Sequence, residues 1–94
     1  MFTLRVTSKN ILQHEIIGLE VRILQYSDPK LVNLEGLVID ETLKTLLIEL
    51  RNGKRIRVFK ANGVFGFKIP DKNDMVVVKG LDIVGRPWER LKMI

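Results

Sequence analysis

The segment LLIELRNGKRIRVF, residues 46–59, decides the fold because it has the pattern of a β-hairpin. Before the turn, apolar residues recur at every second position, which is the spacing of one buried face of a strand; they are Leu46, Ile48 and Leu50. Asn52-Gly53 follows, and this dipeptide predicts a two-residue type I′ turn, because it tolerates the positive φ required at both central positions. The segment therefore predicts two antiparallel strands joined by a tight turn.

The returning strand, residues 54–59, has its charges on one face. Side chains alternate across a strand, so Ile56 and Val58 are expected to point inward. Arg55 and Arg57 are then expected to point outward. This half of the hairpin predicts an apolar inner face and a basic outer face.

Positive charge is concentrated in this part of the chain. Residues 51–72 contain seven basic residues and one acidic residue, whereas the whole chain has a net charge of +5. The stretch 51–60 contains no acid, although solvated strands usually mix both signs. A basic face on a folded domain predicts a polyanionic partner, of which nucleic acid is the commonest. A solvated hairpin rich in charge is the alternative.

Strand patterns continue on both sides of the hairpin. We expect further strands over four segments, which are 19–24, 34–41, 64–69 and 75–79, with a continuation of the last beyond Gly80 over 81–84. Turn-forming residues separate them, as in Tyr26-Ser-Asp-Pro-Lys30. Six short strands with tight turns predict a mainly all-β fold, a small antiparallel barrel that is closed or nearly closed, because closure removes exposed edges.

Short helices are expected at both ends of this barrel. The first spans about 8–17, where apolar residues fall at helical intervals and Gly18 stands where a left-handed residue would end the helix. The second spans about 87–93, since Pro87 suits a first helical position. We expect all 94 residues to form a single domain, with the barrel over about 19–84.

Composition excludes several classes of protein. The chain has no cysteine, which rules out disulfides and cysteine-based zinc sites. Its apolar runs are far shorter than the roughly 20 residues that span a bilayer, and the N-terminus lacks the pattern of a secretory signal. We therefore expect a cytoplasmic protein with no membrane association.

Catalytic residues are scarce. The only histidine is His14, which we interpret as a surface or partly packed helix residue. Asp40 and Glu41 are adjacent at the end of a strand and are expected in a solvated turn. No glycine-rich phosphate loop is present. The sequence therefore predicts no protein active site, no metal site and no bound cofactor.

The aromatic residues of the basic region do not indicate base recognition. Phe59, Phe65 and Phe67 lie there, but Phe65 and Phe67 share one face of a strand and are expected in the core. We therefore expect recognition of RNA shape and phosphates rather than of bases.

Four stretches together resemble a known family. They are HEIIGL at 14–19, GLVIDETLKT at 36–45, KANGVFGFKIP at 60–70 and GLDIVGRPWER at 80–90. In this order and spacing they resemble the archaeal ribonuclease P protein component 1 family, the barrel subunit shared with eukaryotic ribonuclease P and the mitochondrial-RNA-processing ribonuclease. The ending GRPWER, residues 85–90, is the most distinctive of them.

The resemblance implies an Sm-like, SH3-like barrel of six strands with short terminal helices. It implies a non-catalytic subunit of the ribonucleoprotein that removes the 5′ leader from precursor tRNA. The ribonuclease P RNA would carry the chemistry with magnesium ions, and the barrel would bind that RNA and a zinc-containing protein subunit. The expected RNA contacts, including Arg51 from the hairpin, are Lys9, Arg51, Lys54, Arg55, Arg57, Lys60, Lys68, Arg86, Arg90 and Lys92.

Other interpretations stay open at this point. Trp88 is expected to anchor the C-terminal segment to the barrel, while a protein partner is the alternative for a set of apolar residues near the ends, namely Ile11, Leu12, Ile16, Trp88 and Leu91. An Sm-type homo-oligomer that binds single-stranded RNA, a peptide-binding SH3-like module and a small hydrolase are rival functions. The ribonuclease P interpretation predicts a monomer in isolation.

Overall fold

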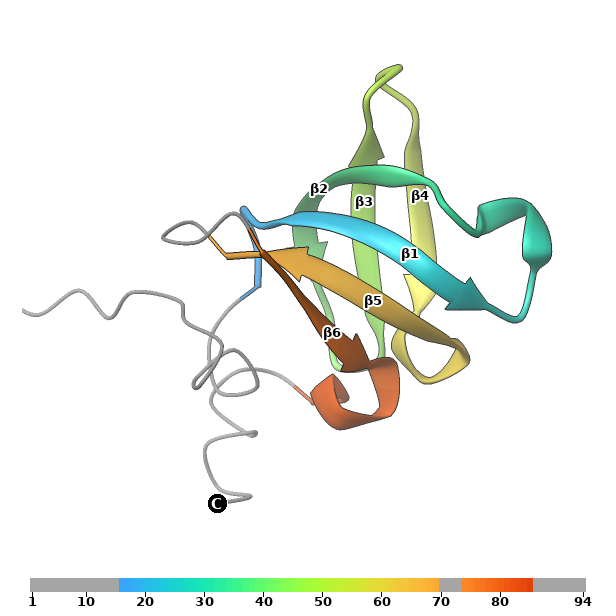
Figure 1. Cartoon of the computed structure of the whole chain (residues 1–94), viewed down its shortest axis with the longest axis vertical. Coiled ribbons are helices and arrows are strands. Elements are labelled where there is room, and N and C mark those ends of the chain that lie inside the picture. Colours follow the sequence, from blue (N-terminus) through green and yellow to red (C-terminus); the bar gives the residue numbers. More distant parts are fainter. Residues whose placement is uncertain (1–15, 70–73, 86–94) are drawn as a thin grey trace, which may run out of the picture.

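The computed structural model describes residues 16–69 and 74–85. This part of the chain forms a six-stranded sheet with three short 3-10 turns (Figure 1). The strands are β1 (Glu20–Tyr26), β2 (Glu35–Glu41), β3 (Thr45–Leu50), β4 (Arg55–Phe59), β5 (Gly63–Lys68) and β6 (Met75–Lys79). The turns are η2 (Pro29–Leu31), η3 (Lys60–Asn62) and η4 (Gly80–Ile83).

All neighbouring strands are antiparallel, in the order β4-β3-β2-β1-β5-β6. Irregular pairing bends β1 between Ile23 and Gln25 and β2 between Val38 and Asp40, because bulges increase the local twist. The sheet curls into a barrel-like shape, with the β3–β4 hairpin projecting at the top of Figure 1. The all-β, barrel-like prediction is confirmed, although the sheet remains open because β4 and β6 are its two edges.

A side-chain hydrogen bond joins β1, in the interior of the sheet, to the edge strand β4. The Tyr26 hydroxyl, at the end of β1, accepts a hydrogen bond of 2.9 Å from the backbone N–H of Phe59, at the end of β4. An exposed edge strand offers unpaired backbone groups to other chains. Tyr26 satisfies one of those groups on β4 and fixes the backbone there.

The turn between β3 and β4 differs from the prediction. The Gly53 N–H donates to the Leu50 carbonyl at 2.9 Å, and the Leu50 N–H donates to the Lys54 carbonyl at 2.7 Å. Gly53 has a φ of 87°, whereas Asn52 does not have a positive φ. The predicted two-residue type I′ turn is therefore wrong. The loop contains Arg51, Asn52 and Gly53, the arrangement of a longer hairpin loop that ends in a glycine bulge.

The predicted continuation of β6 over 81–84 is also wrong, because the chain turns into η4 at Gly80. There η4 packs directly against η3. A Cβ built on Gly80 would lie 1.5 Å from the Lys60 carbonyl oxygen, so only glycine permits this approach of the two backbones. Close packing of the backbone, and not strand propensity, sets the path of the chain after β6.

The core is formed by the inward faces of the strands. Its fully enclosed members include the expected Leu46, Ile48 and Val58. Phe65 and Phe67 are buried as expected, with ring centroids 6.4 Å apart. At about 25 cal/mol per Å² of buried apolar surface, this cluster is the main source of stability.

The structure describes residues 16 and 17 of the first predicted helix, whereas the rest of that helix and the whole of the second, about 87–93, lie outside the described residues. Gly18 has the expected left-handed backbone, with a φ of 94°, and its N–H donates to the Val38 carbonyl at 2.8 Å. Ile16 is fully buried in the barrel core, so its predicted role as an accessible partner contact is wrong. No helix in the described part of the chain is long and apolar enough to cross a membrane.

A buried ion pair closes the end of the barrel opposite the hairpin tip. Lys60 and Glu41 have side chains that are 0% and 1% exposed, and Lys60 Nζ lies 2.7 Å from Glu41 Oε2. The same ammonium donates to three backbone carbonyls, those of Thr42, Leu43 and Gly85, at 2.8, 3.3 and 3.0 Å. A buried charge is tolerated when it is paired and hydrogen-bonded in this way.

We predict that Lys60→Met destabilises the protein strongly. The substitution keeps the length of the side chain but leaves the Glu41 carboxylate and the turn carbonyls without the ammonium, and breaking a buried ion pair typically costs about 3–5 kcal/mol. Denaturant unfolding measures the loss. Lys54→Met removes the same charge from the exposed hairpin tip and is expected to change stability by less than about 0.5 kcal/mol. Equal stability of the two variants would contradict the structural role of Lys60.

Candidate nucleic-acid interface

The pairing of β3 with β4 determines which side chains lie on the outer face of the hairpin. Cross-strand neighbours share a face of the sheet, and the outward pairs are Thr45 with Phe59, Leu47 with Arg57 and Glu49 with Arg55. Arg55 and Arg57 are exposed, while Val58 between Arg57 and Phe59 is buried. The prediction of a basic outer face on β4 is confirmed.

Most basic residues on the outer face of the sheet have a carboxylate partner. Arg55 Nε lies 3.1 Å from Glu49 Oε2, and Lys68 Nζ lies 3.6 Å from Glu20 Oε2. Glu35 pairs with two cations, Arg51 at 3.1 Å and Arg22. Glutamates on β1, β2 and β3 therefore neutralise cations at the hairpin and on β5, a balance that the sequence of the hairpin alone did not indicate.

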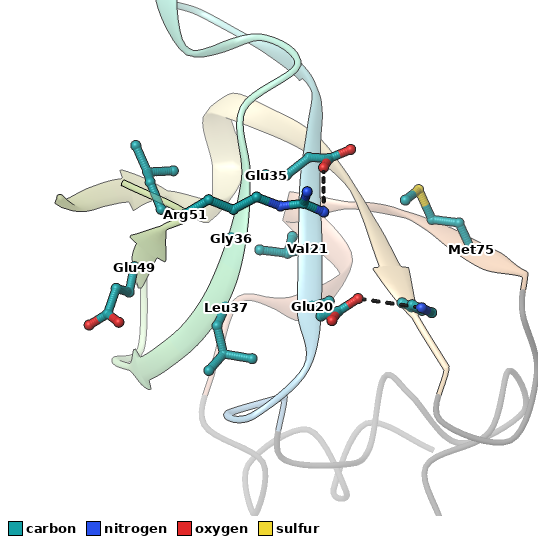
Figure 2. Close-up of a pocket in the computed structure, with 10 residues that line it drawn as sticks. Glu20, Val21, Glu35, Gly36, Leu37, Glu49, Arg51 and Met75 are labelled. Atoms are coloured by element: carbon teal, nitrogen blue, oxygen red, sulfur yellow. Dashed lines mark ion pairs between the residues drawn. The ribbon is translucent and has the colours of Figure 1, made fainter. Parts of the chain in front are cut away.

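These pairs surround a cleft of about 590 Å³ on the outer face of the sheet (Figure 2). Glu20, Glu35 and Glu49 line it together with Arg51 and Lys68, and the apolar contribution comes from Val21, Leu37, Leu50 and Met75. Figure 2 shows Arg51 extending across the strand toward Glu35. Because both signs of charge alternate across its floor, the cleft is not a uniformly basic groove.

Arg57 and Lys54 differ from the other hairpin cations because no ion pair with them occurs among the described residues. Arg57 Nη1 donates to Thr45 Oγ1 at 3.0 Å. Thr45 Oγ1 in turn lies 2.5 Å from Thr42 Oγ1. Lys54 lies at the tip, where its backbone N–H donates to Asn52 Oδ1 at 2.9 Å. The guanidinium of Arg57 is thus oriented by neutral hydroxyls, and its charge is not cancelled there.

The structure brings part of the predicted RNA-contact set together. Arg51, Lys54, Arg55 and Arg57 share the hairpin, whereas Lys68 lies on β5. Lys60 was predicted as a surface contact, and this prediction is wrong because its side chain is fully buried. Several predicted contacts lie outside the described residues; they are Lys9, Arg86, Arg90 and Lys92 for RNA, and Ile11, Leu12, Trp88 and Leu91 for a protein partner.

The sequence analysis missed two features, the buried pair of Lys60 with Glu41 and the exposed ring of Phe59. Glu41 was expected in a solvated turn but is the buried partner of Lys60. Strand alternation could have predicted the burial of Lys60, because it follows Ile56 and Val58 at the same two-residue spacing. The exposure of Phe59, which follows Arg55 and Arg57 in the same way, was visible by the same rule.

No group of three or more histidine or carboxylate side chains in residues 16–69 and 74–85 is placed to hold a metal ion. The glutamates that line the cleft are held by cations, as in a salt-bridged surface. What this face offers chemically is an array of positive groups on a rigid hairpin, which suits contact with an anionic surface.

Comparison with known families decides the relationship of the chain. Residues 9–93 match the family model described as ribonuclease P/MRP, subunit p29. The chain belongs to this p29 family. A resemblance to the archaeal component 1 family is thereby confirmed over nearly the whole length of the sequence.

Relatives of this p29-family chain support the assignment. It is 60% identical to the ribonuclease P protein component 1 of Desulfurococcus amylolyticus over 97% of this chain and 98% of that protein. It is 56% identical to the corresponding protein of Staphylothermus marinus, again over 97% and 98% of the two chains. Among solved structures, that of Mth11, a homologue of the human RNase P protein Rpp29, matches with a TM-score of 0.58 and 42% identity, covering 82% of this chain and 97% of Mth11.

We predict that Glu35, which pairs with two arginines on the outer face of the sheet, is not needed for folding. Glu35→Gln releases both Arg22 and Arg51, but ion pairs on an exposed face contribute only about 0–1 kcal/mol each. Denaturant unfolding should therefore show a loss of less than about 1–2 kcal/mol, and the loss should shrink at high salt. A larger loss of stability that persists at high salt would show that Glu35 supports the fold.

Proposed function

We propose that this protein is a non-catalytic, RNA-binding subunit of ribonuclease P that supports removal of the 5′ leader from precursor tRNA by the RNA subunit. The observation that carries the proposal is the β3–β4 hairpin on which Arg57 and Lys54 present charge without a carboxylate partner among the described residues. Membership of the p29 family supplies the assembly in which this surface would act.

The ion-paired cations can take part in the same contact. Arg51, Arg55 and Lys68 are 83%, 63% and 52% exposed in their side chains, so water and salt already weaken their pairs with glutamate. A phosphate can replace a carboxylate as the acceptor, and arginine can bind it bidentately. The glutamates would then compete with RNA and favour sites at which phosphates meet several cations together.

The chemistry of cleavage is assigned to the RNA partner. Magnesium ions held by that RNA would activate the attacking water, and the protein would bind no cofactor of its own. Neutralised phosphates allow RNA helices to approach one another, which is how a basic barrel would stabilise the active RNA. A zinc-containing protein subunit of the same complex is the proposed protein partner. The isolated chain would be a cytoplasmic monomer.

We predict a strong salt dependence of binding to the ribonuclease P RNA of the same source organism. If the five exposed cations Arg51, Lys54, Arg55, Arg57 and Lys68 contact phosphates, the logarithm of affinity should fall against the logarithm of salt with a slope of roughly −4 to −5. Combining Lys54→Ala with Arg57→Ala should weaken binding and reduce the slope by about 2. Filter binding over a salt series measures both quantities.

A matched control separates this interface from overall charge. Lys30→Ala combined with Lys79→Ala also removes two exposed cations, but from η2 and the end of β6. The control pair is expected to keep the wild-type slope within the error of the measurement. An unchanged affinity and slope for the Lys54 and Arg57 pair, or an equal loss for both pairs, would remove the hairpin from the RNA interface.

A further inference from the structure

Phe59 is the exposed aromatic residue of the basic hairpin. The residue is 54% exposed, whereas the other two phenylalanines of this region, Phe65 and Phe67, are fully buried. It stands on the outer face of β4, two positions after Arg57 and four after Arg55. β4 is an edge strand, so the ring is accessible from the face and beside the sheet. Isolated exposed apolar residues are common on proteins, and three further features distinguish Phe59.

The first feature is a fixed backbone. The Phe59 N–H donates to the Tyr26 hydroxyl at 2.9 Å, and the next residue, Lys60, is anchored in the interior by the ion pair with Glu41. The Lys60 N–H also donates to the Lys44 carbonyl at 2.8 Å. A ring on a fixed backbone loses little conformational entropy when a ligand packs on it.

The second feature is an oriented guanidinium on the same face of the hairpin as the ring. Thr45 is the cross-strand neighbour of Phe59, and Arg57 Nη1 donates to Thr45 Oγ1 at 3.0 Å. The arginine therefore reaches diagonally across to β3, to the residue that pairs with Phe59. Thr42 supports this arrangement, because its hydroxyl lies 2.5 Å from Thr45 Oγ1 and accepts from the Thr45 N–H at 3.0 Å.

The third feature is the charge around the pair. Glu49, the carboxylate on the adjacent strand, is engaged by Arg55, and Asp40 is separated from Arg57 by Leu47 in the pairing of β2, β3 and β4. The described residues place no carboxylate in an ion pair with Arg57. An aromatic face beside an uncompensated guanidinium matches a nucleotide, which joins an aromatic base to a phosphate.

We propose that Phe59 and Arg57 form a binding site for one unpaired nucleotide, with the base stacked on the Phe59 ring and its phosphate held by Arg57. This inference rests on the proposed RNA-binding function and adds a preference to it, namely a single-stranded loop, bulge or junction instead of a continuous duplex. Bases inside a duplex are stacked on one another and cannot reach the ring. The proposal departs from the expectation that this surface reads only shape and phosphates.

Two RNA probes with equal numbers of phosphates test the proposal on the full chain. One is a hairpin with an unpaired adenosine loop that contains 2-aminopurine, and the other is a fully paired duplex. Phe59→Leu keeps an apolar side chain without a π face, so it should weaken binding of the loop probe about 5- to 100-fold. Affinity for the duplex and the slope against salt should not change, because no charge is removed.

Three further variants complete the design. Phe59→Trp should retain loop binding and the quenching of 2-aminopurine fluorescence, because it restores an aromatic face. Arg57→Ala should weaken the binding of both the loop probe and the duplex. Val77→Ala truncates an exposed apolar side chain on the opposite edge strand β6, where Val77 is 63% exposed, and should alter neither. Thermal unfolding of each variant confirms that the barrel is intact.

Each contrary outcome has a distinct meaning. If Phe59→Leu binds the loop probe like the wild type, or loses equally on loop and duplex, the stacking site is wrong, and weaker binding by Arg57→Ala would still support the RNA-binding function. If the wild-type chain binds neither probe nor the ribonuclease P RNA, the proposed function itself fails. If Phe59→Leu leaves RNA affinity unchanged but prevents association with a purified protein subunit of the complex, Phe59 is a protein contact and the inference is overturned.

Discussion

The ammonium of Lys60 is the constraint on which the arrangement of the surface depends. It is fully buried and binds the carboxylate of Glu41 and the carbonyls of Thr42, Leu43 and Gly85. A buried charge is tolerated when it is paired and hydrogen-bonded, so the end of β2, the turn before β3 and the segment that follows η4 are held together. Because side chains alternate along β4, burying Lys60 also fixes Phe59 on the outside of the barrel.

The outer face of the sheet combines exchangeable and uncompensated charge. Arg51, Arg55 and Lys68 pair with glutamates in exposed positions, where such pairs are weak and salt-sensitive. Arg57 is held by the Thr45 hydroxyl, so its orientation does not depend on a carboxylate. The phosphates of a polyanion that meets this face would replace the glutamates as partners of these cations. They would bind Arg57 without competition from a carboxylate.

Strand periodicity predicted most of the fold, and long-range packing accounts for what it missed. Ile56 and Val58 were placed correctly, but Lys60 at the same spacing was taken for a surface residue because its charge outweighed its position. Its partner Glu41 follows an irregularity in β2 that shifts the alternation, and no local pattern reveals such a shift. The tight contact at Gly80 likewise depends on how distant turns meet, whereas the loop at Gly53 is closed by hydrogen bonds within residues 50–54. Local sequence located the basic hairpin. Of the glutamates that balance it, Glu49 lies on β3 within the same hairpin, and Glu35 comes from β2.

Reconstituted cleavage of precursor tRNA tests the central claim most directly. The ribonuclease P RNA of the same source organism would be assayed at limiting magnesium, alone, with this protein, and with this protein and the proposed zinc-containing subunit. The account predicts that the proteins restore 5′ cleavage at a magnesium concentration at which the RNA alone is inactive, and that the proteins without the RNA do not cleave. Cleavage by this protein without RNA, or RNA-dependent cleavage that is unchanged when it is omitted, would contradict the account.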